Sequence, residues 1–360
     1  MNKNTSQKFL VANQPEEDSL QLWKNRYMTM EISGDRSMEV EKKIDLQLQR
    51  FVDFFIQKAG HDKVTAVVPR YVKEWLADLY QDGKRFAPST VNNHQANLSK
   101  FMSWLKFHAP HLLQKNPIKG IKEIGLPAPD PRAFNEDQVR SLKSICDRLE
   151  RFHQKKGRQW RGKDAPLKEH ARPKRDRAIV FTLLSTGLRR EELVMLNLDQ
   201  LQPNDPVLLR SARKARIVRV RGKGRTERTL FLSLDARHAI ADYIEFERGQ
   251  DETSEESIAL FLSAYKIPAR FPDGRLHKRS INRILEQIGK WHDAEQTDIE
   301  RQISPLRPHD LRHTFAFLLA KETGGDRFEL QRRLGHRSDK YIEIYTNPPE
   351  EIAVTYVEKM

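Results

Sequence analysis

Apolar residues recur at helical spacing through the first third of the chain. Over residues 38–55 they are separated by three or four positions, which places them on one face of a helix. Similar patterns follow over residues 69–83 and 88–105, and each opens at a proline, a residue that fits the first turn of a helix. Residues 1–36 are mostly polar and predict a partly ordered extension that holds at most a short helix. The pattern therefore predicts an all-helical domain over residues 37–115, preceded by that extension.

A segment rich in helix-breaking residues follows the helical patterns. Residues 116–134 carry four prolines and two glycines, a composition typical of an extended connector. This segment predicts a boundary between the helical domain and a second domain over residues 135–360.

The second domain combines helical patterns with a short alternating region. The stretches VLLRSA, RIVRVRG and ERTLFLS, between residues 207 and 233, are rich in β-branched and bulky residues and are separated by basic turns. They predict a small antiparallel sheet, in which the turn GKG at 222–224 places Lys223 at a hairpin tip. Helices are expected over 135–149, 176–185, from about 188, and over 234–248, 278–292, 309–322, 326–334 and 338–346. The predicted fold class is mainly α with a small antiparallel β-sheet.

The charge of the chain indicates a polyanionic partner. Lys and Arg outnumber Asp and Glu by 64 to 50, which gives a net charge of +14 and makes nucleic acid the leading candidate. Residues 151–177 concentrate this charge, with eleven Lys or Arg and three acidic residues. Two interpretations of this basic segment stay open. It is either a solvated surface loop or a contact to the DNA backbone through Lys155, Lys156, Arg158 and Arg161.

Other classes of protein are disfavoured by what the sequence contains. A single cysteine, Cys146, excludes an internal disulfide framework and fits a reducing compartment. No apolar run approaches the roughly 20 residues needed to span a bilayer, and the first residues lack the apolar core of a signal peptide. These features predict a cytoplasmic protein with no membrane partner.

Short motifs in the second domain carry the most specific signal. They are TGLRREEL at 186–193, RGKGR at 221–225, HDLRH at 309–313, and LGH at 334–336 followed nine residues later by a tyrosine. Their order and separation resemble the tyrosine recombinase (phage integrase) family. The resemblance covers roughly residues 38–348. It implies that the helical domain is a core-binding domain on DNA and that residues 135–360 form an α+β catalytic domain.

The resemblance implies three residues that bind the scissile phosphate. A phosphodiester is anionic, so two guanidinium groups that each contact phosphate oxygens stabilise the added charge of a five-coordinate transition state. Arg189 and Arg312 match these positions. His336 matches the residue that hydrogen-bonds the phosphate.

The resemblance also implies how the phosphate is attacked. Tyr341 and Tyr345 lie one helical turn apart, so helical spacing alone does not choose between them. The family offset from the LGH motif selects Tyr345 as the nucleophile. A tyrosine hydroxyl has a pKa of about 10 and needs a proton acceptor, for which His309 is the candidate. Lys223 is the candidate general acid that protonates the departing 5′ oxygen.

Two further residues match supporting positions, and three arginines are candidate DNA contacts. Glu192 matches the acidic residue that orients the site, although a surface carboxylate is an equally good interpretation from sequence. His313 is a candidate support residue or a packed helix histidine. Because they lie beside the motif residues, Arg190, Arg225 and Arg337 are expected to contact DNA.

The expected function is site-specific recombination of double-stranded DNA through a covalent 3′-phosphotyrosyl intermediate, in the integration, excision or transposition of a mobile element. It would need no cofactor and no metal. A homotetramer would exchange the strands, and an accessory DNA-bending protein or second recombinase is a compatible partner. Two alternatives stay open. One is a catalytically silent DNA-binding regulator, and the other is a metal-dependent nuclease that uses His309, His313 and His336.

Overall fold

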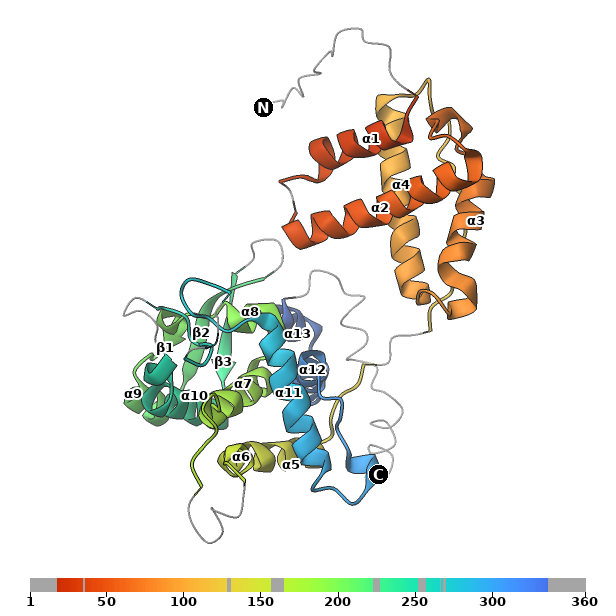
Figure 1. Cartoon of the computed structure of the whole chain (residues 1–360). Helices are drawn as coiled ribbons and strands as arrows, with labels where there is room; N and C mark the ends of the chain where they lie inside the picture. The colour runs from red at the N-terminus through yellow and green to blue at the C-terminus, as the bar shows by residue number, and fades with distance from the viewer. Residues whose placement is uncertain are drawn as a thin grey trace. The chain divides into compact units, whose positions relative to one another are not determined.

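The computed structural model of the chain divides into two units, Met1–Ala128 and Pro129–Met360 (Figure 1). It describes residues 18–34, 36–127, 131–156, 165–222, 227–251, 257–265, 267 and 270–335. The division falls inside the proline-rich segment 116–134. Within the described ranges, no helix is both long enough and apolar enough to cross a bilayer.

The first unit is a bundle of helices around one apolar core. Its elements are α1 (Leu20–Tyr27), η1 (Met28–Ile32), α2 (Met38–Ala59), η2 (Val64–Ala66), α3 (Pro69–Tyr80), η3 (Gln81–Gly83) and α4 (Pro88–His108). The three helices predicted over 38–55, 69–83 and 88–105 are confirmed as α2, α3 and α4. Large side chains such as Phe51, Trp75 and Phe101 are fully buried between them.

Residues 20–32 are part of this core, and not an extension outside it as the sequence suggested. Leu20, Trp23, Tyr27 and Ile32 are all buried in the same cluster as the side chains of α2 and α4. The rings of Trp23 and Tyr27 lie 6.2 and 5.3 Å from the ring of Trp104 on α4. Two aromatic rings bury as much surface as several aliphatic residues, so this segment docks although residues 1–36 as a whole are mostly polar.

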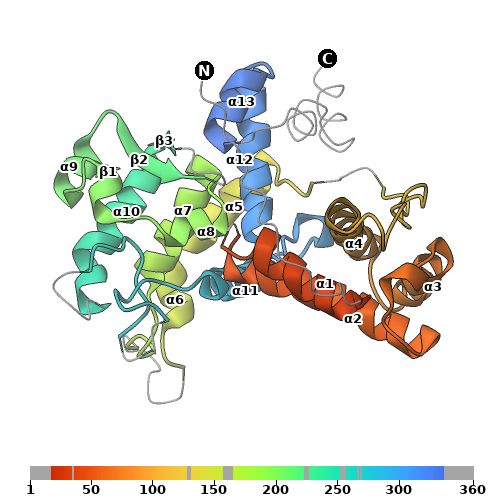
Figure 2. The same ribbon diagram turned by 90° about the horizontal axis from the view of Figure 1, so that it is seen from above.

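The second unit is mainly helical. Its helices are α5 (Glu136–Asp147), α6 (Leu149–His153), α7 (Pro173–Thr186), α8 (Arg190–Val194), η5 (Leu198–Gln200), α9 (Pro206–Ser211), α10 (Leu234–Phe246), η6 (Arg248–Asp251), α11 (Lys278–Asp293), η7 (Ile299–Arg301), α12 (Pro308–Glu322) and α13 (Arg327–Leu334). α7 is the central helix and packs against α5, α6, α10, α12 and the sheet (Figure 2). The predicted helices are present, with α5 in the range 135–149 and a separate short helix, α6, starting at its last residue. The one expected over 338–346 lies outside the described residues.

A three-stranded antiparallel sheet completes the second unit, in the order β1 (Leu201–Gln202), β2 (Ala215–Arg221) and β3 (Glu227–Leu232). Strands β2 and β3 were predicted, but the stretch VLLRSA was not correctly assigned, because it forms α9. Pro206 cannot donate a ladder hydrogen bond, and the Asp205 side chain accepts the N–H of Leu208 at 2.8 Å. A capped proline start therefore outweighs the β propensity of the residues that follow it.

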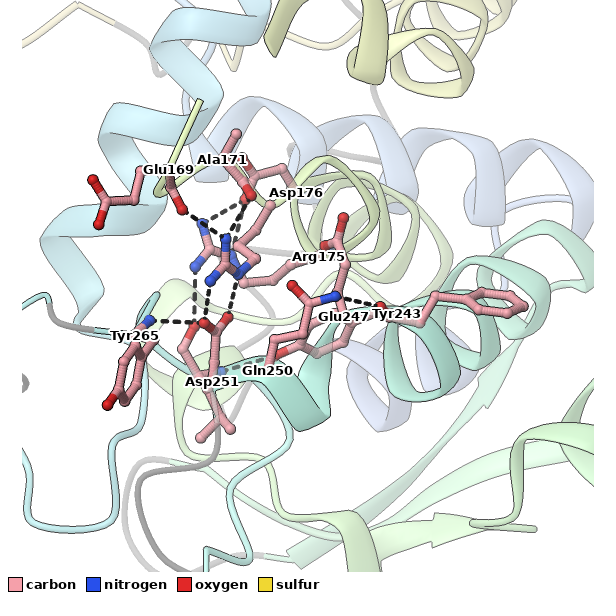
Figure 3. Close-up of polar contacts among 12 residues, drawn as sticks. Glu169, Ala171, Arg175, Asp176, Tyr243, Glu247, Gln250, Asp251 and Tyr265 are labelled. Atoms are coloured by element: carbon pink, nitrogen blue, oxygen red, sulfur yellow. Dashed lines mark hydrogen bonds and ion pairs between the residues drawn. The ribbon is translucent and has the colours of Figure 1, made fainter. Parts of the chain in front are cut away.

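A buried ionic network fixes the start of α7 (Figure 3). The carboxylate of Glu247 accepts the backbone N–H groups of Lys174 and Arg175 at 3.0 and 2.9 Å. Beside it, Arg172 Nε donates to Asp251 at 2.6 Å, and Asp251 also accepts the Tyr265 N–H. The network joins the start of α7 to the end of α10 and to residues 257–265.

Two stretches inside the basic segment are paired before the chain reaches this network. Backbone hydrogen bonds run from Lys155 N–H to the Pro166 carbonyl at 2.9 Å and from Lys168 N–H to the His153 carbonyl at 3.0 Å. Lys155 and Lys156 are exposed beside these hydrogen bonds. The structure therefore fixes the backbone at residues 153–155 and 166–168, while Arg158 and Arg161 lie outside the described residues.

Candidate active site

The turn between α7 and α8 positions Arg189. Gly187 caps the end of α7 with a φ of +60°, in the left-handed region, and a Cβ at this position would overlap the ring of Phe315. Glu192 then accepts the backbone N–H of Arg189 at 2.8 Å and its Nη1 at 3.0 Å. The motif TGLRREEL thus folds into a turn that sets both the backbone and the guanidinium of Arg189.

Arg312 joins two segments that carry predicted site residues. It lies on α12, is only 3% exposed, and donates from Nη1 to the carbonyl of Gly187 and from Nη2 to the carbonyl of Leu334 at 2.7 Å. Gly187 precedes Arg189 by two residues, and Leu334 precedes His336 by two. Arg312 therefore holds the Arg189 turn and the end of α13 against the same helix.

His309 and His313 lie one turn apart on α12, with their ring centroids 6.4 Å apart. Partial desolvation lowers the pKa of His309, and the positive charges of Arg312, Arg190 and Arg189 lower it further. Burial lowers the pKa of His313 to about 4, with contributions from His309 and Arg312. Both imidazoles are therefore neutral at pH 7, the form in which a histidine can accept a proton.

Arg228 on β3 is a member of the site that sequence reasoning missed. Its Nη1 and Nη2 donate to the two carboxylate oxygens of Glu192 at 3.1 and 2.7 Å, and its Nε donates to the Arg333 carbonyl at 3.0 Å. Burial alone would raise the pKa of Glu192, but the hydrogen bonds and charge of Arg228, together with Arg189, hold that pKa below its ordinary value. The sequence did contain a signal, since Arg228 shares its strand parity with the buried residues Leu230 and Leu232.

Several predicted site residues lie just beyond segments that the structure describes. β2 and β3 pair on either side of residues 223–226, and Gly335 is the last described residue before the rest of the LGH motif. Besides Arg158 and Arg161, the predicted residues that lie outside the described ranges are Lys223, Arg225, His336, Arg337, Tyr341 and Tyr345. Arg190 is described and donates to Asn282 on α11 at 3.1 Å. Lys155 and Lys156 lie beside α6, not on the elements that carry Arg189 and Arg312.

The side chains described above include groups that can bind an anion and groups that can accept a proton. Two guanidinium groups, Arg189 and Arg312, lie near two neutral imidazoles, and Glu192 orients one of the guanidiniums. This arrangement can bind an anion and accept a proton at the same place, as attack on a phosphodiester requires. Among the residues that the structure describes, no group of three or more histidine, cysteine or acidic side chains is placed to hold a metal ion.

Known proteins of similar sequence were identified over most of the chain. The model of the phage integrase family matches residues 164–351. A tyrosine recombinase XerC of Syntrophus aciditrophicus is 27% identical over 275 residues, which cover 76% of this chain and 74% of the relative. A tyrosine recombinase XerD of Bradyrhizobium diazoefficiens is 26% identical over 310 residues, 86% of each chain.

Solved structures show the same fold at lower identity. The Tn1549 transposon integrase in complex with a circular intermediate DNA aligns with a TM-score of 0.65 at 16% identity, covering 94% of this chain and 98% of that one. The XerH site-specific recombinase in its post-cleavage complex aligns with a TM-score of 0.63 at 17% identity, covering 86% of this chain and 76% of that one.

Proposed function

The chain belongs to the phage integrase family of DNA strand-transferring enzymes, and we propose that it recombines DNA at specific sites through a 3′-phosphotyrosyl intermediate. The observation that carries this proposal is the double hydrogen bond of Arg312 to the carbonyls of Gly187 and Leu334. It places the segment that begins at Arg189 and the segment that leads to His336 beside the same buried guanidinium. Motifs more than a hundred residues apart in sequence thereby meet at one place.

In the proposed reaction, the Tyr345 hydroxyl oxygen attacks the scissile phosphorus and its proton passes to His309. The bond between phosphorus and the 5′ oxygen breaks, and Lys223 donates a proton to that oxygen. Arg189, Arg312 and His336 stabilise the charge on the phosphoryl oxygens. The energy of the broken bond is retained in the new phosphotyrosyl linkage. No high-energy cofactor is therefore consumed, and a 5′ hydroxyl from a second strand can reverse the step.

The biological setting that we propose is the movement of a genetic element by integration, excision or transposition. Two duplexes would be held by a homotetramer, with double-stranded DNA as the partner and an accessory DNA-bending protein or second recombinase as a compatible addition. The solved transposon integrase and XerH structures were determined with DNA, which supports DNA as the partner. A cytoplasmic location fits this partner.

The decisive experiment is capture of a covalent adduct. Purified protein is incubated with duplex fragments that tile the genomic segment around its own gene, the reaction is stopped with SDS, and attached DNA is sequenced to the junction. We expect an SDS-resistant adduct on one or a few fragments, with the protein on a 3′ phosphate, and equal yield with and without EDTA.

The two alternative functions give different results in the same experiment. A silent regulator would bind a fragment in a gel-shift assay and form no adduct on any of them. A metal-dependent nuclease would cut without a covalent linkage, and EDTA would stop the cutting. An adduct that survives EDTA excludes both.

The lowered pKa of His309 predicts the pH dependence of adduct formation. At the ordinary pKa of 6.5, half of the His309 side chains would be protonated at pH 6.5. Because the pKa is lowered, more than half stay neutral at that pH, so the rate at pH 6.5 should stay above half of its plateau value and fall below half only at lower pH. Single-turnover rates between pH 5 and 8 measure this profile.

His309→Gln provides the comparison for the pH profile. It should lower the plateau rate by about 10²- to 10⁴-fold and remove the decline at low pH. If the wild-type rate is already halved at pH 6.5 and the variant lacks that step, His309 has an ordinary pKa and the prediction is wrong.

The basic segment gives a prediction about salt. Replacing Lys155, Lys156, Arg158 and Arg161 with alanine should flatten the dependence of DNA affinity on salt, since each lost phosphate contact reduces the slope by about 0.9. Sequence preference should stay nearly unchanged, because phosphate contacts carry no base information. Dissociation constants across a salt series, on the captured fragment and on a scrambled one, test both parts. Wild-type affinity and slope in the variant would identify the segment as a solvated loop.

A further inference from the structure

We propose that Arg228 is a positioning residue for strand cleavage, which keeps the charge of Arg189 available to the phosphate and holds three segments of the active site together. The inference rests on the recombinase function proposed above and assigns a role to a residue outside the four motifs that define the site.

Arg228 contacts each of the three segments directly. It belongs to β3, the strand that follows residues 223–226, so it is part of the hairpin expected to carry Lys223. Its guanidinium spans both oxygens of Glu192, which orients Arg189. Its Nε reaches the carbonyl of Arg333 in the last turn of α13.

The guanidinium also packs closely against Gly335. A Cβ at this glycine would lie 3.1 Å from Arg228 Nη1, and the backbone there has a φ of +65°. Both features favour glycine at the position immediately before His336. Arg228 thus packs against the glycine that caps α13 and immediately precedes His336 in the sequence.

The charge balance explains why a second arginine is needed. Glu192 accepts hydrogen bonds from Arg189 at 3.0 Å and from Arg228 at 2.7 Å, so one carboxylate lies between two guanidiniums. The three groups together carry one positive charge. Without Arg228, Glu192 and Arg189 would form a neutral pair, and the attraction of Arg189 for a phosphate would be weakened.

Exposure determines which of the two arginines can meet the substrate. The side chain of Arg228 is 8% exposed, and that of Arg189 is 31% exposed. Three nitrogens of Arg228 are already bonded to protein acceptors. Arg189 therefore faces the phosphate, and Arg228 acts on the reaction through Glu192.

The test compares variants on the DNA fragment that wild-type protein attaches to covalently. Arg228→Met should lower the single-turnover rate of adduct formation by about 10²-fold, comparable to losing one preorganised donor, while changing DNA affinity less than about threefold. Arg228→Lys should be intermediate, because an ammonium keeps the charge but cannot span both carboxylate oxygens and a carbonyl.

A matched control separates positioning from general stability. Arg172→Met removes another buried arginine that is bonded to both oxygens of a carboxylate, that of Asp251 in the network of Figure 3. It should lower the thermal unfolding temperature as Arg228→Met does, yet keep the adduct rate within about threefold of wild type at a temperature where both variants are folded.

The double variant Glu192→Gln with Arg228→Met tests the charge argument. A neutral glutamine can still accept from Arg189 but no longer cancels its charge, so the double variant should form adduct at least about tenfold faster than Arg228→Met alone. A merely structural role for Arg228 predicts no such recovery.

The outcomes distinguish this inference from the function on which it rests. If wild-type protein forms no adduct on any fragment, the proposed function fails and the inference with it. If wild type forms adduct and Arg228→Met matches it within threefold, the inference alone is overturned. It is also overturned if Arg172→Met slows the reaction equally, or if the double variant shows no recovery.

Discussion

Tyr345→Phe is expected to abolish the covalent adduct while leaving DNA affinity within about threefold of wild type. The substitution removes only the hydroxyl oxygen that would bond to phosphorus, and loss of an essential nucleophile lowers turnover by at least about 10⁴-fold in comparable enzymes. A gel-shift assay measures binding, and SDS-resistant protein–DNA species measure the chemical step.

Tyr341→Phe is the matched control, because it removes the same atom from a tyrosine four residues earlier in the sequence. It should retain adduct formation within about tenfold of wild type, as expected for a residue that packs near the site rather than reacts. The choice of nucleophile is falsified if Tyr345→Phe still forms the adduct and Tyr341→Phe does not.

Arg312→Gln should lower the rate of adduct formation by about 10³-fold, the upper end of what removal of one preorganised donor costs. It should also destabilise the second unit, since the carbonyls of Gly187 and Leu334 would lose their partner in a buried position. Each such loss costs about 1–3 kcal/mol of unfolding free energy. Single-turnover rates and denaturant unfolding measure the two effects.

The control for Arg312 is Arg301→Gln on η7. Arg301 is 70% exposed and paired only loosely with Asp298 at 3.6 Å, so rate and stability should both stay near wild type. An Arg312→Gln variant with a wild-type rate would show that this guanidinium holds the fold and does not serve the reaction.

Much of the fold was predictable because the helices of both units follow a simple repeat. α2, α3 and α4, and later α10 to α13, each present apolar residues at spacings of three and four. The errors arose where local composition and tertiary packing disagree. VLLRSA has strand-like residues, but Asp205 and Pro206 start a helix there. Residues 1–36 are mostly polar, yet within them Trp23 and Tyr27 contact an aromatic ring on α4 that is distant in sequence.

Sequence motifs pointed to Arg189 and Arg312, whose roles stay predictions, and no motif pointed to Arg228. Arg189 and Arg312 stand in recognisable motifs, and the structure brings the turn before Arg189 into contact with Arg312. Arg228 stands in a hairpin with many cations, and composition cannot tell which of them turns inward. Arg228 lies on the same face of β3 as the buried residues Leu230 and Leu232, where a charged side chain is unusual. That observation indicates an inward-facing arginine only after the bounds of the strand are known.

Two acceptors of Arg312 have an evolutionary consequence. The carbonyls of Gly187 and Leu334 belong to the main chain. A carbonyl is present whatever the side chain, so a substitution at Leu334 that preserves the end of α13 leaves the acceptor in place. A buried charge held by side-chain acids would need two compatible mutations to change. The contact to Leu334 can therefore survive a change of side chain, whereas Gly187 is restricted by its left-handed φ and by the ring of Phe315.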